Sequence, residues 1–159
     1  MYNVNSRERI QEAIDVRMQD EHIMPIPITT AIIGKWSLLS SENLKAYFEA
    51  VKLPEKVQMA WEHGIDRYEM KYDLFFLLHT ELPDKSFMIP TFFEMGKRTI
   101  SPHDCIVTRI ENNSMITTRT KWTGSSEEWK EERSVQNDKL IIVNTKDGVR
   151  CTRTYQRVI

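Results

Sequence analysis

Beyond Gly64 the chain consists of short strand-like segments separated by turn signals, with no helical period between them. Tyr68, Met70 and Tyr72 alternate with polar residues, and 74–78 is a continuous apolar run. Further segments of this kind follow at 87–95, 105–110, 115–122, 129–135, 140–144 and 149–158. Strands in series without intervening helices are typical of an antiparallel meander, and closing a meander into a barrel removes its unpaired edges. We therefore predict an all-β, up-and-down antiparallel barrel of about ten strands.

A strand and two short helices are predicted ahead of the meander, at 33–39, 42–52 and 54–63. Pro54 separates the two helices and can open the second, which a glycine then ends. The apolar face of the first helix consists of Leu44, Tyr47, Phe48 and Val51. We expect the pair to form a helix-turn-helix lid on the barrel.

Two features of the meander limit how the barrel closes. Pro90 falls inside a predicted strand and has no N–H for a ladder hydrogen bond, so it requires a sheet edge, a bulge or a gap. Turn signals between the strands include 82–84, 111–113, 123–125, 136–138 and 147–148.

Residues 1–32 are predicted to be an extension of the barrel at 33–159. The segment 6–20 has helix signals, and its apolar stripe lies on one helical face. That stripe consists of Ile10, Ile14 and Met18. Pro25 and Pro27 exclude a helix around them and favour an extended connector.

Composition excludes several classes of protein. Lys and Arg number 22 against 23 Asp and Glu, so the net charge of −1 creates no basic field for nucleic acid. Two cysteines cannot form a disulfide framework and indicate a reducing compartment. With no secretory signal and no apolar run of about 18 residues, we expect a cytoplasmic protein, with the nucleus as a second location. No metal-ligand, nucleophile or phosphate motif is present, so we predict no enzyme, no metal and no cofactor.

Three short segments carry the pattern of a known family. They are the opening Gly34-Lys35-Trp36 with Ser41-Glu42-Asn43, the turn Lys121-Trp122-Thr123-Gly124 and the closing run Cys151-Thr152-Arg153-Thr154-Tyr155. In this order and spacing they resemble the intracellular lipid-binding proteins, which include the fatty-acid-binding and cellular retinoid-binding proteins. The resemblance covers about residues 33–159. It implies a β-clam barrel that carries a hydrophobic ligand without enzymatic activity.

The closing strand contains the predicted head-group site. Arg153 and Tyr155 lie two apart on a strand and so face the same side. The pattern alone also fits an exposed strand, but the resemblance implies that this pair holds a ligand carboxylate. The family's second arginine has two candidates, because counting back from Leu140 favours Arg133 and counting forward from Trp122 favours Glu131. A glutamate would repel a carboxylate, so we predict Arg133.

The resemblance also suggests residues of the ligand entrance. Phe87 lies close to the family's portal phenylalanine, and the underside of the lid would consist of Leu44, Tyr47 and Phe48. For Leu44 and Tyr47, packing in the core fits the pattern equally well. The segment between Gly96 and Cys105 is shorter than the family pattern, which predicts a stunted fifth strand.

The expected function is encapsulation of a hydrophobic carboxylic acid, above all a long-chain fatty acid, by a monomer. One alternative is a retinoid carrier. Another is a lipid-sensing module in which the helix at 6–20 docks a partner protein. Transient contact with anionic membranes is possible through lysines on or beside the lid, although these also fit an ordinary solvated surface. These are Lys45, Lys52 and Lys56.

Overall fold

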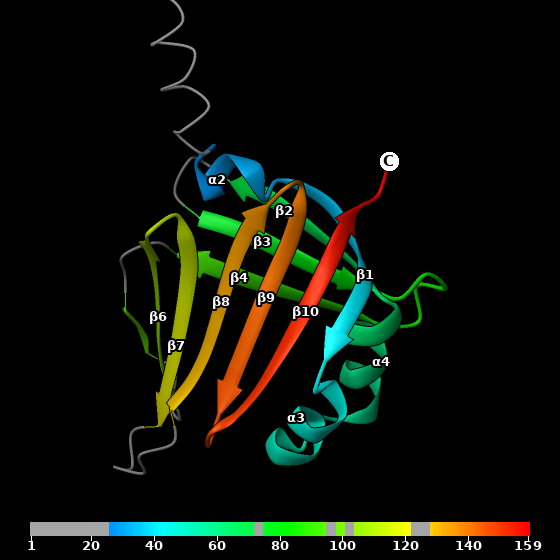
Figure 1. Ribbon diagram of the computed structural model, residues 1–159, viewed down its shortest axis with the longest axis vertical. Coiled ribbons are helices and arrows are strands. Elements are labelled where there is room, and N and C mark those ends of the chain that lie inside the picture. Colours follow the sequence, from blue (N-terminus) through cyan, green and yellow to red (C-terminus); the bar gives the residue numbers. More distant parts are fainter. Residues whose placement is uncertain (1–25, 72–74, 95–97, 101–103, 122–127) are drawn as a thin grey trace, which may run out of the picture.

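The architecture is a single ten-stranded antiparallel sheet that curls into a barrel, seen in a computed structural model that describes residues 26–71, 75–94, 98–100, 104–121 and 128–159. The strands are β1 (Gly34–Glu42), β2 (Ile65–Lys71), β3 (Phe75–Glu81), β4 (Met88–Glu94), β5 (Arg98–Ile100), β6 (Asp104–Glu111), β7 (Ser114–Lys121), β8 (Glu128–Gln136), β9 (Lys139–Lys146) and β10 (Val149–Arg157). Figure 1 shows β8 to β10 crossing in front of β2 to β4, with β6 and β7 to one side and the helices at two ends. The predicted all-β barrel with a helical lid is confirmed.

The strand order is β4-β3-β2-β1-β10-β9-β8-β7-β6-β5. Strands that follow one another in the sequence therefore pair, except β4 and β5, which lie at the two edges of the sheet, and β1 also pairs with β10. β4 is therefore an edge, and Pro90 lies on it opposite His79 of β3. Pro90 requires an edge, a bulge or a gap, and the structure places it on an edge, where a proline costs no ladder hydrogen bond on its outer side. β5 at the other edge spans only three residues, as the shortened segment predicts.

Alternation along the last two strands sorts their side chains between core and solvent. On β9 every second side chain from Leu140 to Lys146 is buried, and on β10 the buried set includes Cys151, Arg153 and Tyr155. The main core cluster consists of Ile28, Ile32, Trp36, Tyr68, Leu78, Phe93, Met115, Leu140, Ile142 and Tyr155. The last strand thus turns the charged side chain of Arg153 toward the same interior as this apolar cluster.

The hairpin turns between these strands use residues that tolerate a left-handed backbone. Positive φ angles occur at 112–113, 137–138 and 147–148, which are Asn, Asp or Gly positions. Such pairs match the twist of two-residue hairpins. The turns predicted at these three places are confirmed.

The lid helices are α3 (Leu44–Val51) and α4 (Glu55–His63). α3 begins two residues later than predicted, because β1 continues to Glu42 and Asn43 adopts a left-handed turn with φ of 60°. α4 follows Pro54 and ends before Gly64, where a Cβ atom would collide with the Ala60 carbonyl oxygen.

None of the helices in the described ranges is long and apolar enough to cross a membrane.

A one-turn helix, α2 (Ile28–Ala31), packs on the end of the barrel away from the lid (Figure 1). Ile28 and Ile32 are 1% and 0% exposed and belong to the main core cluster. The backbone N–H of Ile28 donates to Asn113 Oδ1, and Arg157 donates to the carbonyl oxygen of Ala31. The division of the chain at residue 32 stays a prediction, but the part of the extension that is described here contributes to the barrel's core. The helix predicted at 6–20 lies outside the described residues.

Candidate functional site

A cavity of about 380 Å³ lies inside the barrel, beneath the lid helices. Its apolar lining comes from the lid and from the facing strands: Val51, Leu53, Val57, Trp61, Leu78, Ile89, Phe92, Phe93, Ile106 and Trp129. Its polar lining includes Asp66, Thr80, Glu131, Arg133, Asn144 and Arg153. The volume is at the low end of the roughly 300–1,000 Å³ typical of small-molecule pockets. The cavity therefore suits one slender molecule with an apolar body.

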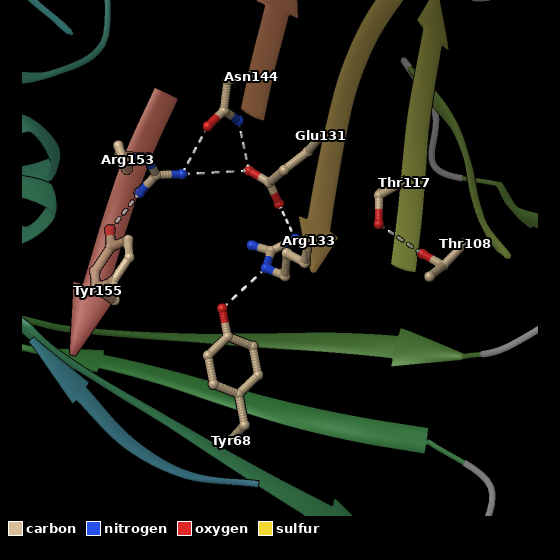
Figure 2. Close-up of polar contacts among 8 residues, drawn as sticks. All are labelled: Tyr68, Thr108, Thr117, Glu131, Arg133, Asn144, Arg153 and Tyr155. Carbon is tan, nitrogen blue, oxygen red and sulfur yellow. Dashed lines mark hydrogen bonds and ion pairs between the residues drawn. The ribbon is translucent and has the colours of Figure 1, made fainter. Parts of the chain in front are cut away.

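Charged and hydroxyl side chains meet at one part of this interior, as Figure 2 shows. Six of them, which we call the buried polar cluster, are Tyr68, Glu131, Arg133, Asn144, Arg153 and Tyr155. They come from β2, β8, β9 and β10, and the curling of the sheet brings them together in its interior.

Arg153 is fixed on several sides. Its Nη1 donates to the hydroxyl of Tyr155 at 2.7 Å and its Nη2 to Oδ1 of Asn144 at 2.8 Å. Its Cζ lies 3.6 Å from the centre of the Trp61 ring, which places the guanidinium against a lid aromatic. Its Nε is buried and has no hydrogen-bond partner among the described residues. Arg153 thus lines the cavity with one donor still unused.

Arg133 is held by a second set of groups. It forms an ion pair with Glu131, and its Nε donates to the Tyr68 hydroxyl at 2.9 Å. Its Cζ lies 4.8 Å from the centre of the Phe93 ring. Burial opposes the charged form, but the adjacent Glu131 carboxylate raises the pKa of Arg133 above its ordinary value.

Glu131 lies between the two arginines (Figure 2). Its Oε1 pairs with Arg133, while its Oε2 accepts from Asn144 Nδ2 at 2.7 Å and lies 3.8 Å from Arg153 Nη2. Burial by itself would raise the pKa of Glu131, but the charges of Arg133 and Arg153 hold it below its ordinary value. Glu131 is therefore an internal anion whose side chain is still 23% exposed.

A second carboxyl group faces the same interior. Asp66 on β2 is 5% exposed, and burial raises its pKa to about 6, although the charge of Arg153 and a hydrogen bond with Thr80 act in the opposite direction. With Asp66 ionised, two carboxylates balance the two guanidinium groups. This part of the cavity is then close to electrically neutral before any ligand enters.

The structure brings together the three residues predicted to bind a head group. Arg153, Tyr155 and Arg133 are 3%, 1% and 3% exposed and belong to the same cluster. Glu131, the competitor for the second-arginine position, is there too, because residues 131 and 133 lie two apart on β8 and face the same side. Tyr155 accepts a hydrogen bond from Arg153 but is not among the described residues that line the cavity itself.

The predicted entrance residues divide between core and cavity. Leu44, Tyr47 and Phe48 form a second core cluster with Cys151, and Tyr47 alone of these four lines the cavity as described. Phe87 lies in the segment before β4 and is half-buried. Among the described residues the cavity is lined by side chains of β4 and not by Phe87. A portal role for Phe87 stays a prediction.

Sequence reasoning missed four residues that shape the site. Trp61, Asp66, Tyr68 and Asn144 were not singled out as site residues. Asn144 had a local signal, since it continues the buried alternation of β9. The described ranges contain no group of three His, Cys, Asp or Glu residues that could hold a metal ion.

Comparison with known proteins identifies the relatives of this chain. Over 156 residues, 98% of the chain, it is 41% identical to protein EEED8.3 of Caenorhabditis elegans, described as uncharacterized, of which the match covers 74%. No protein-family model matches the chain.

Solved structures with the same fold include two proteins named for lipid binding. One is lipid binding protein 8 of Caenorhabditis elegans, with a TM-score of 0.67 and 16% identity over 80% of this chain and 96% of that one. Another is fatty-acid-binding protein 1 of Echinococcus granulosus, with a TM-score of 0.64 and 19% identity over 81% of this chain and 98% of that one. The chain therefore belongs to one family with EEED8.3 and has the barrel fold of the intracellular lipid-binding proteins.

Proposed function

We propose that the protein is a carrier that encloses a single long-chain lipid within the barrel. The observation that carries this proposal is the 380 Å³ cavity, whose apolar walls lead to one polar region. In that region Arg153 keeps a buried Nε donor without a partner among the described residues. A buried donor of this kind is costly unless an acceptor reaches it, and the oxygen of a lipid head group would supply one.

The apolar walls supply the affinity for the chain of the lipid. Each buried CH₂ group contributes up to about 0.8 kcal/mol, although ordering of the chain removes much of the gross gain. Val57 and Trp61 approach from the lid, while Leu78 and Phe93 approach from the strands. A chain between these walls would place its head group near Arg153.

The lid helices are well placed to control entry. Trp61 of α4 stacks with Tyr47 of α3 at 5.9 Å between ring centres and also covers Arg153. Opening the lid would separate Trp61 from Arg153. Ligand entry and the position of the Arg153 guanidinium are therefore expected to be coupled.

An arginine variant tests the proposed binding mode. Arg153→Gln should weaken binding of a fluorescent long-chain lipid about 10- to 100-fold, since a hydrogen bond from a charged donor contributes about 1.5–3 kcal/mol. The matched control is Arg150→Gln, an exposed position on the same strand, which should bind as the wild type does. The measurement is a fluorescence titration of the three proteins. Equal affinity of all three would show that Arg153 does not contact the ligand.

Several finer predictions remain open to experiment. The predicted head group is an ionised carboxylate held by Arg153, Tyr155 and Arg133, and the presence of Glu131 between the two guanidinium groups argues against it. A retinoid ligand, a docking role of the helix at 6–20, the cytoplasmic location, the monomeric state and the membrane contact stay predictions.

A further inference from the structure

The polar region of the cavity contains carboxylates that neutralise its two arginines. Arg133 and Arg153 supply two positive charges, and Glu131 and Asp66 supply two negative ones. Two further cations, Arg119 and Lys130, also line the cavity, and the Cζ of Arg119 lies 5.2 Å from the centre of the Trp129 ring. The balance therefore concerns the four groups around Glu131 and not the whole lining of the cavity.

From this balance we propose that the cavity selects lipids with an uncharged head group that both donates and accepts hydrogen bonds, such as a long-chain alcohol or primary amide, over the ionised fatty acid. The inference rests on the proposed carrier function and concerns the head group alone. Glu131 occupies the place beside both arginines that an incoming carboxylate would need.

The cost of admitting a carboxylate follows from the contacts of Glu131. A ligand anion that pairs with Arg133 has to displace the Glu131 oxygen already there. Glu131 would then be a buried charge that has lost a partner, and the ligand's own charge would also have left water. Removing one partner of a buried ion pair is strongly destabilising, so the exchange is unfavourable.

An uncharged head group does not have to displace Glu131. It can instead bond to groups of the buried polar cluster whose hydrogen-bonding capacity is not used up among the described residues. Its oxygen accepts from the unpartnered Arg153 Nε, and its O–H or N–H donates to Glu131, whose side chain is 23% exposed. Desolvation of a neutral hydroxyl or amide costs far less than desolvation of a carboxylate. Both carboxyl groups are ionised at slightly alkaline pH, since the pKa of Glu131 is lowered and that of Asp66 is about 6.

Matched ligands test the inference on the wild type. Palmitic acid, its primary alcohol and its primary amide share one chain, so apolar burial is the same for all three. At slightly alkaline pH the alcohol and the amide should displace a bound fluorescent lipid at concentrations at least about tenfold lower than the acid. Acid binding as tight as or tighter than that of the alcohol overturns the inference and leaves the carrier function standing. If none of the three binds, the carrier function itself fails.

Removing the internal anion should reverse the order. In Glu131→Gln the acid should gain at least about tenfold over the alcohol relative to the wild type, while Glu132→Gln, on the opposite face of the same strand, should keep the wild-type order. Asp66 forms no ion pair with the residues that the structure describes, so Asp66→Asn removes the other negative charge without breaking one of them. It should shift the ratio in the same direction even if Glu131→Gln fails to fold. An unchanged ratio in every folded variant overturns the inference.

Discussion

Replacing Glu131 with glutamine is expected to lower the free energy of unfolding of the ligand-free protein by about 3 kcal/mol, the lower end of the range for breaking a buried ion pair. Glutamine keeps the size and the hydrogen-bonding capacity of the side chain but removes the charge between Arg133 and Arg153. The positive charges of Arg133 and Arg153 then repel each other, and among the described residues of the site Asp66 is the carboxylate that remains. Denaturant unfolding of the delipidated protein, monitored by circular dichroism, measures the change.

A neighbouring residue provides the control for this loss. Glu132 lies on the same strand with its side chain on the other face, so Glu132→Gln should change the free energy of unfolding by less than about 0.5 kcal/mol. A loss below about 1 kcal/mol in Glu131→Gln would contradict the role of Glu131 as the internal counter-ion.

Asp66 is expected to make the protein less stable as the pH rises. Its pKa in the folded state, about 6, lies above the ordinary value of 3.8, so folding favours the protonated form. The stabilisation from this protonation is fully present below about pH 3.8 and is lost as the pH rises through about 6. The full difference corresponds to roughly 3 kcal/mol, from two pKa units at about 1.4 kcal/mol each.

Comparison with Asp66→Asn isolates this effect. Glu131 acts in the opposite direction, because its lowered pKa provides stability that is lost as the pH falls, but it is present in both proteins and cancels in their difference. The asparagine variant should therefore gain stability relative to the wild type between pH 4 and pH 7.5, as measured by denaturant unfolding across that range. A constant difference between the two proteins would contradict the raised pKa of Asp66.

Most of the fold follows from local patterns in the sequence. The period of two along β9 and β10 marks the buried positions, and the Asn, Asp and Gly positions with positive φ mark the hairpins between strands. Pro90 identifies an edge because proline cannot donate to a second neighbouring strand. The predicted start of α3 at Glu42 is two residues early, because Ser41 and Glu42 continue β1 in its pairing with β10.

The site was predictable only in part, because its members meet through long-range packing. Arg153 and Tyr155 are neighbours on one strand, so their spacing shows that they share a face. Tyr68 reaches Arg133 across 65 residues of sequence, and no local pattern indicates that contact. Glu131 and Arg133 are alternatives for one position when the spacing of the sequence is counted, yet strand geometry places both side chains inside the barrel.

The central claim is that the barrel interior holds a single lipid molecule. Native mass spectrometry of the purified protein, followed by denaturation and identification of what is released, tests it most directly. The account predicts a complex of one chain with one long-chain lipid, and the released lipid should carry an alcohol, amide or other uncharged head group. A chain that remains free of lipid, and whose mass does not change when long-chain acids, alcohols and amides are offered, would contradict the account.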